Sequence, residues 1–362
     1  MSLDLLTLSG KAFGGFESFK SRIVEAAENV IGAEGIVLAC THTHTAPESG
    51  AITNLYQTEA FRNWGQSLAH SIGQAIASAT TALTQCTLSY GASELSGWGI
   101  HRRVKTTSGI MMSHPEPPEE IVLSRDGAID ESVNVLWVRN RRGELISAVV
   151  NATCHPVYEM CNPEVSPDYP GEFCSRMEAA HGGAVALFLN GAAGNINPRF
   201  VSAGSASAER HAEQLMAAVT RAAVDAELEP NPVLSLRRRT FKLPCRLPHG
   251  QDRGLTIKAE VAAVRLGDAA IAFLPGEPFA ETGIELRAKS PFELTAIVGF
   301  AEESVGYIPT DEAFMEGGYE IGFGAWSILA PGSEPRLRQE GAELLKELMA
   351  GENAHRRISH VG

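Results

Sequence analysis

The chain has 362 residues, of which 44% are hydrophobic and 20% are charged, an ordinary balance for a globular protein. Its formal net charge of −13 excludes nucleic acid as a general partner, because an acidic surface repels phosphate groups. No apolar run reaches membrane-spanning length and no signal peptide is visible, so we expect a cytoplasmic protein without a transmembrane segment.

The cysteines are spread along the chain without C-x-x-C pairs, which indicates free thiols in a reducing compartment rather than a disulfide framework. They are Cys40, Cys86, Cys154, Cys161, Cys174 and Cys245.

The first predicted elements are a helix over Phe16–Ile31 and a buried strand over Ile36–Cys40 that leads into His42 and His44. Side chains alternate along a strand, so both imidazoles should point to the same side. Two imidazoles at a strand end suit a metal site or a proton relay, although two solvated loop histidines are an alternative.

The middle of the chain alternates predicted helices, strands and loops. A long loop is expected over residues 105–130. A hairpin turn at Asn140–Gly143 joins two strands, and the second of them leads into His155. The other elements expected here are a helix over Phe61–Leu83, strands over Thr87–Tyr90, Val133–Val138 and Leu145–Ala152, and a helix over Gly171–His181.

A buried strand over Ala184–Leu189 runs into the small and amide residues of Asn190–Pro198, which allow the backbone to approach a ligand closely. This segment is not a P-loop, since it lacks the Lys-Ser/Thr pair. A later strand, Ala269–Leu274, is expected to form a second hairpin with Val261–Leu266 around Gly267-Asp268, and Glu277 follows it closely. The remaining expected elements are helices over Ala208–Ala226, Phe279–Ala288 and Leu337–Met349, and strands over Val233–Leu243, Val261–Leu266 and Leu294–Phe300.

The chain shows no internal repeat and no clear linker. We therefore expect one compact α/β catalytic domain over residues 1–350, with a polar tail over residues 351–362. Large twisted mixed sheets flanked by helices are the expected architecture, and a mixed α+β arrangement is the alternative.

Several apolar strands thus end in polar residues, and ligands of α/β folds bind beyond the carboxyl ends of strands. Histidines together with a glutamate match the ligand set of catalytic zinc, which keeps a position open for water or substrate. His155 or Glu277 alone would more often be structural, and their shared placement is what favours a site.

The chain resembles the catalytic domain of the neutral/alkaline (non-lysosomal) ceramidase family. The segment His42–Pro47 is similar to the family's H-T-H-S-G-P, and Asn190–Pro198 to its N-x-G-D-x-S-P. The strand end Asn151–Pro156, the segments Leu274–Glu277 and Gly306–Thr310, and Tyr319-Glu320 follow in the same order.

The resemblance implies a zinc hydrolase of N-acyl (amide) bonds. It implies one zinc ion held by His42, His155, Glu277 and Tyr307, with His44 as a catalytic partner. It further implies Tyr319 as a donor to the oxyanion and Arg102 as a substrate contact, with Arg103 able to fill the same role. Asn195 and Asp168 are further expected substrate-binding residues, and Asp168 or His44 could act as general base.

The sequence departs from the family pattern in three respects. Asn197 stands at the family's serine, which favours a metal-activated water as the attacking group and an amide donor to the oxyanion. The family's amino-terminal strands are not found before Asp4. Its carboxyl-terminal immunoglobulin-like domain is not found either, which weakens the case for ceramide itself.

Three hypotheses follow. The first is a zinc-dependent amidase acting on a small-molecule N-acyl or ester substrate. The second is a non-catalytic metal- or ligand-binding relative, and the third is a metal-free hydrolase that uses Asp168 or His44. The sequence predicts neither the substrate nor the oligomeric state.

Overall fold

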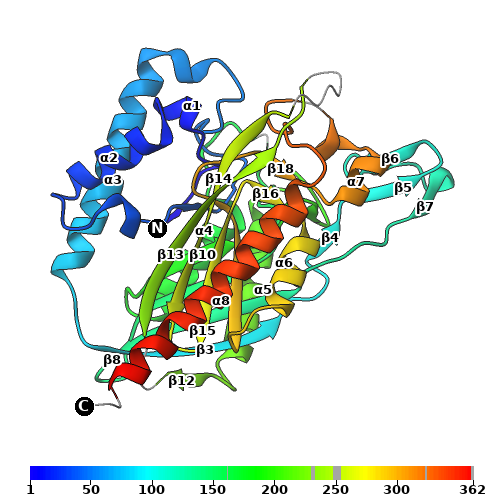
Figure 1. The fold of residues 1–362 in the computed structure, drawn as a ribbon. Helices are drawn as coiled ribbons and strands as arrows, with labels where there is room; N and C mark the ends of the chain where they lie inside the picture. The colour runs from blue at the N-terminus through cyan, green and yellow to red at the C-terminus, as the bar shows by residue number, and fades with distance from the viewer. Residues whose placement is uncertain (161, 230–232, 248–253, 323, 360–362) are drawn as a thin grey trace.

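Two mixed β-sheets form the centre of the computed structural model (Figure 1). The structure describes residues 1–160, 162–229, 233–247, 254–322 and 324–359. The larger sheet contains, in spatial order, β1 (Ser2–Leu3), β2 (Ala39–Cys40), β17 (Leu294–Ala301), β15 (Ala269–Pro275), β14 (Thr256–Leu266) and β13 (Leu234–Pro244). The smaller sheet contains β10 (Val185–Asn190), β9 (Leu145–Ala152), β8 (Ser132–Asn140), β3 (Cys86–Glu94) and β12 (Glu227–Glu229).

Both sheets contain parallel and antiparallel pairs. β15 pairs in parallel with β17, and β10 pairs in parallel with β9, whereas β14 pairs antiparallel with both of its neighbours, β13 and β15. The two predicted hairpins are confirmed: β8 pairs with β9, and β14 pairs with β15. The second hairpin turns at Gly267, whose φ of 67° lies in the left-handed region that favours glycine.

The two sheets pack face to face, and the alternating side chains of β15 show how. Ile271 and Phe273 point toward the smaller sheet, where they share an apolar cluster with Leu136. Ala272 and Leu274 point the other way, into a cluster with the outer helices. A strand that is buried on both faces needs a continuous apolar run, which is what the sequence provides.

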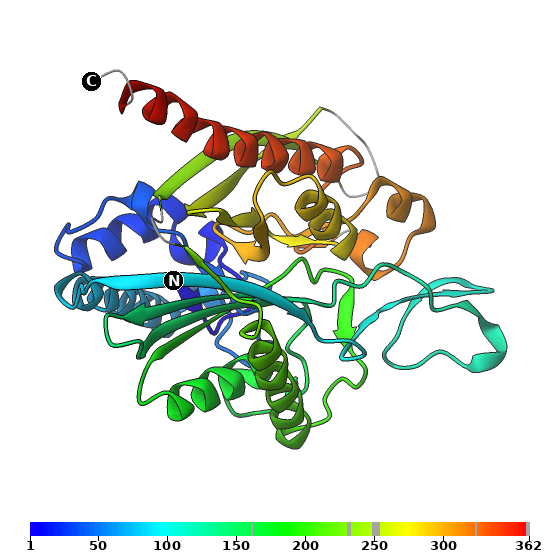
Figure 2. The same ribbon diagram turned by 90° about the horizontal axis from the view of Figure 1, so that it is seen from below.

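Helices cover the outer face of each sheet, which gives four layers (Figure 2). α6 (Ala280–Ala288) and α8 (Ser333–Ser359) pack on the larger sheet, and α4 (Asp168–Ala180) and α5 (Ser205–Ala222) on the smaller one. The expected fold class, one α/β domain of large mixed sheets flanked by helices, is confirmed.

A separate helical group, α1 (Gly10–Phe13), α2 (Phe16–Ala26) and α3 (Glu59–Thr81), lies at one end of the sheets (Figure 1). α2 and α3 approach each other closely at Gly73. A side chain there would place its Cβ 2.5 Å from the Cβ of Ala26, so the contact requires glycine.

The expected long loop over residues 105–130 is wrong in part, because it contains strands. β5 (Arg103–Thr106) pairs with β6 (Gly109–Met112) and with β7 (Val122–Ser124) to form a small sheet that projects from the body (Figure 2). Each of these strands is only three or four residues long, which is too short to show the apolar alternation by which a strand is recognised.

Three other expectations need correction. The helix that starts at Phe16 ends at Ala26, before the positive φ angles of Glu28 and Asn29. The strand expected over residues 36–40 is reduced to the two residues of β2. The closing helix α8 continues to Ser359, through most of the segment expected as a tail, and residues 360–362 lie outside the described residues.

Among the described residues, no helix is both long and apolar enough to cross a membrane. Five cysteines are free thiols, and Cys161 lies outside the described residues. The remaining elements are β4 (Gly99–His101), β11 (Ile196–Pro198), β16 (Glu277–Pro278), β18 (Tyr307–Ile308), α7 (Asp311–Glu316), and the 3₁₀ turns η1 (Ala33–Gly35), η2 (Leu55–Gln57), η3 (Glu119–Ile121) and η4 (Tyr319–Ile321).

Candidate functional site

Four chain segments bring polar side chains to one point beside the sheet edges. His42 and His44 follow β2, and His155 follows β9. Glu277 begins β16, which pairs in parallel with β18 so that Glu277 stands opposite Tyr307. Residues that are far apart in the sequence thus share one neighbourhood, which we call the histidine centre.

The nitrogen atoms of the histidine centre lie close together. The Nε2 atom of His42 is 3.1 Å from that of His155 and 3.4 Å from that of His44, and the three rings offer donor atoms that all lie within 4.8 Å of one another. Oε2 of Glu277 is 3.4 Å from Nε2 of His42 and 3.7 Å from Nε2 of His155. His42 and His155 are buried, and His44 is partly exposed.

Backbone carbonyls fix the tautomers of the two buried rings. Nδ1–H of His42 donates to the carbonyl of Leu6 over 2.6 Å, and Nδ1–H of His155 donates to that of Ile196 over 2.9 Å. In its neutral form each ring therefore carries a lone pair on Nε2, and both Nε2 atoms lie near the carboxylate of Glu277, whose buried Oε2 has no hydrogen-bond donor in the described residues. Acceptors at these distances repel one another unless a cation, a proton or a metal ion, lies between them.

The ionisation of these groups agrees with a cation-binding centre. Burial lowers the pKa of His155 to about 4, with the Arg102 charge adding to the effect, and burial together with the other imidazoles lowers the pKa of His44. Burial of Glu277 opposes its ionisation, but His42 and His155 outweigh it and hold its pKa well below the ordinary value. At neutral pH the centre thus presents the neutral imidazoles of His44 and His155 beside the carboxylate of Glu277, the protonation states that bind metal ions.

The backbone around His42 and His155 is held by hydrogen bonds and by a ring contact. Asn190, at the end of β10, donates from Nδ2 to the carbonyls of Thr41 and Cys154 over 2.9 and 3.0 Å. His42 itself has a φ of 70°, and its ring stacks on Phe300 with 3.9 Å between the centroids. These contacts turn the chain sharply after β2 and hold the imidazole in one orientation.

Arg102 is the cation of the site. Its Nε donates to Glu320 over 2.8 Å and its Nη1 to Asn197 Oδ1 over 3.4 Å, and Nη1 also lies 3.3 Å from Nε2 of His155. Burial opposes the charge of this guanidinium, but Tyr307 and Glu320 raise its pKa above the ordinary value. Nη2 is buried and has no partner among the described residues, so a donor is left available beside the histidine centre.

Tyr307 and Tyr319 both lie near the guanidinium of Arg102. Its guanidinium carbon is 5.3 Å from the ring centroid of Tyr307 and 5.8 Å from that of Tyr319. Burial raises the pKa of the Tyr307 phenol well above its ordinary value, although Arg102 opposes this. Tyr319 is 46% exposed and stacks on Trp326, which places it at the outer side of the site.

Arg103 points away from the histidine centre. It donates to Glu320 over 2.7 Å and to the carbonyl of Gly317 over 2.9 Å, and it also pairs with Glu316. Its side chain therefore holds the segment that carries Tyr319.

Asn195 and Asp168 are occupied by local hydrogen bonds. Asn195 donates to Glu281 and accepts the backbone N–H of Ala280, each over 2.8 Å. Asp168 accepts the backbone N–H groups of Glu159 and Tyr169, and burial raises its pKa to about 6. The structure gives neither side chain a contact with the histidines.

The small residues of Asn190–Pro198 serve contacts between chain segments. A Cβ on Gly194 would lie 2.5 Å from the carbonyl oxygen of Glu277. Glycine at this position thus lets the loop after β10 pack directly on β16. The predicted close approach exists, but the partner that the structure shows is the protein backbone.

The sequence reasoning gave no role to Glu320 and Asn190. Two adjacent arginines, Arg102 and Arg103, do indicate an acidic partner, and Glu320 fills that need for both. Nothing local in the sequence tells which of 43 acidic residues it is.

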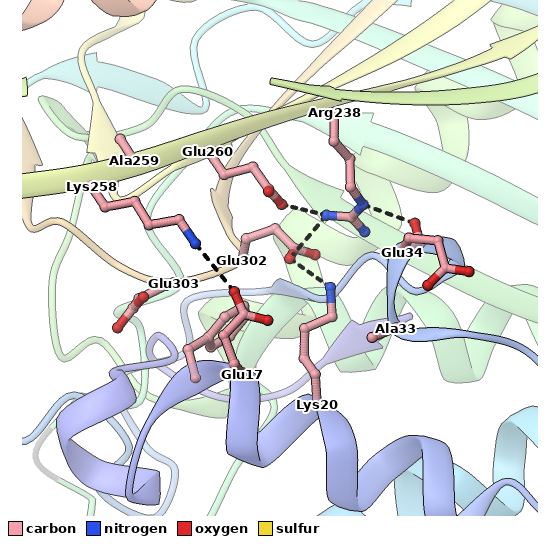
Figure 3. A pocket seen from close by; sticks show the side chains of 11 residues that line it. Glu17, Lys20, Ala33, Glu34, Arg238, Lys258, Ala259, Glu260, Glu302 and Glu303 are labelled. Atoms are coloured by element: carbon pink, nitrogen blue, oxygen red, sulfur yellow. Dashed lines mark hydrogen bonds and ion pairs between the residues drawn. The ribbon is translucent and has the colours of Figure 1, made fainter. Parts of the chain in front are cut away.

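A second buried charge cluster supports the strand that leads to His42 (Figure 3). Glu302, just after β17, accepts the backbone N–H of Leu38 over 2.9 Å and pairs with Lys20 and Arg238 over 2.9 and 3.2 Å. Lys20 also donates to the carbonyl of Ile36 over 2.8 Å. Arg238 is thus part of an ion-pair network with Glu302 and Lys20, which we call the Glu302 cluster.

The fold and the site together define a four-layer α/β protein with a group of three histidines, two of them buried, that could hold a metal ion. Among the solved structures that share this fold are the following two. One is described as neutral ceramidase from Pseudomonas aeruginosa, with a TM-score of 0.76, 20% sequence identity and 96% of this chain covered. The other is described as ceramidase complexed with C2, with a TM-score of 0.74, 17% identity and 96% of this chain covered.

The chain spans 65% and 67% of the lengths of those two proteins. No family model matches the sequence, and no curated protein matches it. At these identities the likeness establishes the fold.

Proposed function

We propose that this protein is a zinc-dependent hydrolase that cleaves the N-acyl bond of a small amide. The observation that carries the proposal is the histidine centre: two Nε2 lone pairs and an unpartnered carboxylate oxygen face one buried point. The fold shared with proteins described as ceramidases supports an amide as the substrate.

The donor set fits a single zinc ion. His42, His155 and Glu277 would hold it, with either Tyr307 or His44 as a further ligand. Imidazole nitrogens and carboxylate oxygens are preferred zinc ligands, and the Nδ1 hydrogen bonds to Leu6 and Ile196 are the kind of support that orients ligand histidines. When bound, zinc polarises a carbonyl and lowers the pKa of water.

The remaining side chains are suited to the charge changes of amide hydrolysis. The free Nη2–H of Arg102 can donate to the carbonyl oxygen as it gains negative charge. Asn197 accepts from Arg102 through Oδ1, which leaves its Nδ2 as a second donor. His44 is neutral and partly exposed, so its ring can take a proton from water and return it to the departing amine.

The outer part of the site favours an apolar acyl or amine group. Tyr319 and Trp326 stack there in parallel with 5.9 Å between their centroids. Aromatic rings of this kind bury apolar chains, and Tyr319 could also donate its hydroxyl to the substrate.

The test is turnover of a panel of N-acyl amides and esters before and after metal removal. We expect hydrolysis of at least one amide, its loss after chelation, and its recovery when zinc is added back. Turnover that persists in protein shown to be free of metal would favour the metal-free alternative.

A second candidate is a metal- or ligand-binding relative without catalysis. Asn197 motivates it, because an amide cannot act as a nucleophile in place of a serine. Zinc-loaded protein that turns over no member of the panel would support this second candidate.

A further inference from the structure

A cavity of about 390 Å³ lies on the helical group formed by α1, α2 and α3. Its charged side chains differ from those of the cavity that the Glu302 cluster lines. Three basic side chains line it, Lys11, Arg22 and Arg62, and no acidic side chain does. This is unusual in a chain with a net charge of −13. We call it the basic cavity.

The two arginines are held in place without neutralisation. Arg22 donates from Nη2 to the carbonyl of Phe13 over 2.8 Å, and Arg62 donates from Nη1 to the carbonyl of Gln57 over 2.6 Å. Each guanidinium has further N–H groups. Nε of Arg22 is buried and has no partner among the described residues.

The ammonium of Lys11 is also free of an acidic partner in the described part of the chain. It lies 5.1 Å from the ring centroid of Tyr56. Glu48 acts electrostatically on the same tyrosine, but its carboxylate already accepts the N–H of Ile52 and the hydroxyl of Thr53, each over 2.8 Å.

The cavity in Figure 3 provides the contrast. There Lys20 and Arg238 pair with Glu302, and Lys258 pairs with Glu17. Its positive charges are balanced by the protein itself, whereas those of the basic cavity are available to a ligand.

The floor of the basic cavity is apolar. Phe13 and Phe61 line it and are 4% and 9% exposed, and Gly65 leaves room above the Phe13 ring. A ligand that matches these walls carries an oxyanion at one end and a short apolar body at the other.

We propose that the basic cavity is a binding site for a small amphipathic oxyanion, of the class of alkyl or aryl phosphates and carboxylates. Guanidinium groups bind such oxyanions through charge-assisted hydrogen bonds, and the two phenylalanines receive the apolar body. The inference is independent of the reaction at the histidine centre.

The test is calorimetric titration of the full chain with octyl phosphate, inorganic phosphate and octylamine. Octyl phosphate should bind at one site, inorganic phosphate about tenfold or more weakly, and octylamine not at all. Equal affinity for inorganic phosphate would overturn the apolar part of the proposal, and equal affinity for octylamine would overturn the anionic part.

The matched variants locate the site. In the double variant Lys11→Gln/Arg62→Gln we expect octyl phosphate to bind about tenfold or more weakly, because two charged donors are lost. The control Lys346→Gln/Arg142→Gln removes the same charges at exposed positions elsewhere and should bind as wild type does. All four side chains are exposed, so the urea midpoints should stay the same.

Unchanged affinity in the Lys11/Arg62 variant would overturn the proposal, as would an equal loss in the control. Vesicles distinguish a free ligand from a lipid headgroup. Sedimentation with phosphatidylglycerol vesicles that depends on Lys11 and Arg62, and that octyl phosphate does not compete away, would overturn the small-molecule form of the proposal.

Discussion

The histidine centre and the Glu302 cluster are both buried, and both support the chain around β2 from residues far away in the sequence. They differ in how completely their polar atoms are paired. Glu302 meets two cations and a backbone N–H, and no atom of the cluster lacks a partner in the described residues. In the histidine centre the Oε2 atom of Glu277 and the nearby Nη2 atom of Arg102 lack one.

This difference separates a structural role from a functional one. A buried polar group without a partner destabilises the fold, and a bound ligand or ion can supply the missing partner. The Glu302 cluster is complete without a ligand and serves to hold the segment from Ile36 to Leu38 in place. The histidine centre is incomplete by the same measure, and it is the part of the molecule that we expect to bind a metal ion.

The largest expected effect is on metal binding. His155→Ala removes one of the nitrogen ligands, and we expect zinc affinity to fall by about 100-fold or more. Loss of a residue that only supports a ligand already lowers metal affinity by about 10- to 100-fold. Metal analysis of the purified variant checks this, with His70→Gln on the exposed face of α3 as the control. Equal zinc content in wild type and His155→Ala would contradict the comparison.

The next effect is on stability. Glu302→Gln leaves Lys20 and Arg238 without their buried carboxylate, and we expect the free energy of unfolding to fall by about 3–5 kcal/mol. Glu260→Gln removes a more exposed partner of Arg238 and should cost at most about 1 kcal/mol. Urea unfolding measures both.

The folded fraction of Glu302→Gln should still bind zinc. If this variant lost zinc binding without losing stability, the division between the two regions would be wrong.

Asn190→Ala should affect both properties to a smaller degree. It removes the partner of the Thr41 carbonyl, whereas the Cys154 carbonyl keeps the hydroxyl of Tyr169, and the loss should cost about 1–3 kcal/mol. Because these carbonyls adjoin His42 and His155, zinc affinity should also fall, by about 10-fold or more. Asn54→Ala, in an exposed turn, is the control, and parallel denaturation and zinc titration make the measurement.

The smallest effect concerns His211, a histidine buried for packing and outside the histidine centre. Burial lowers its pKa to about 3, and its ring stacks on Tyr169 with 4.0 Å between the centroids. The unfolded chain therefore binds one more proton between pH 6.5 and 3. The stability that neutral His211 contributes is complete above pH 6.5 and is lost as the pH falls toward 3.

We expect His211→Gln to reduce the slope of unfolding free energy against pH in this range by up to about 1.4 kcal/mol per unit. Denaturation from pH 4 to pH 7 measures the slope, and His70→Gln should leave it unchanged. The same slope in His211→Gln and wild type would show that this imidazole is not held neutral by burial.

Much of the fold could be predicted from local patterns. The apolar runs of β9 and β15, their hairpin turns and the helical spacing of α3 are properties of neighbouring residues, and the structure confirms them. The strands of residues 103–124 could not be recognised in this way, because each is only three or four residues long, too short for a periodic apolar pattern.

The histidine centre could be predicted only as a set of side chains at strand ends. Its decisive contacts join residues far apart in the chain, such as Nδ1 of His42 with the carbonyl of Leu6. A backbone carbonyl has no signature in the sequence. The partners of Arg238 and Glu302 were missed for the same reason, since the sequence shows charges but not their pairing.

The pairing of β16 with β18 has a consequence for how this site could change. Glu277 and Tyr307 are neighbours across two parallel strands of two residues each, and a pleated strand presents alternate residues to opposite sides. One residue inserted between Glu302 and Gly306 would put Gly306 opposite the glutamate and rotate the phenol to the far side. Insertions of two residues in that connection should therefore be tolerated better than insertions of one. The site thus depends on whether the length of this connection is odd or even, although no residue of the connection contacts the histidine centre.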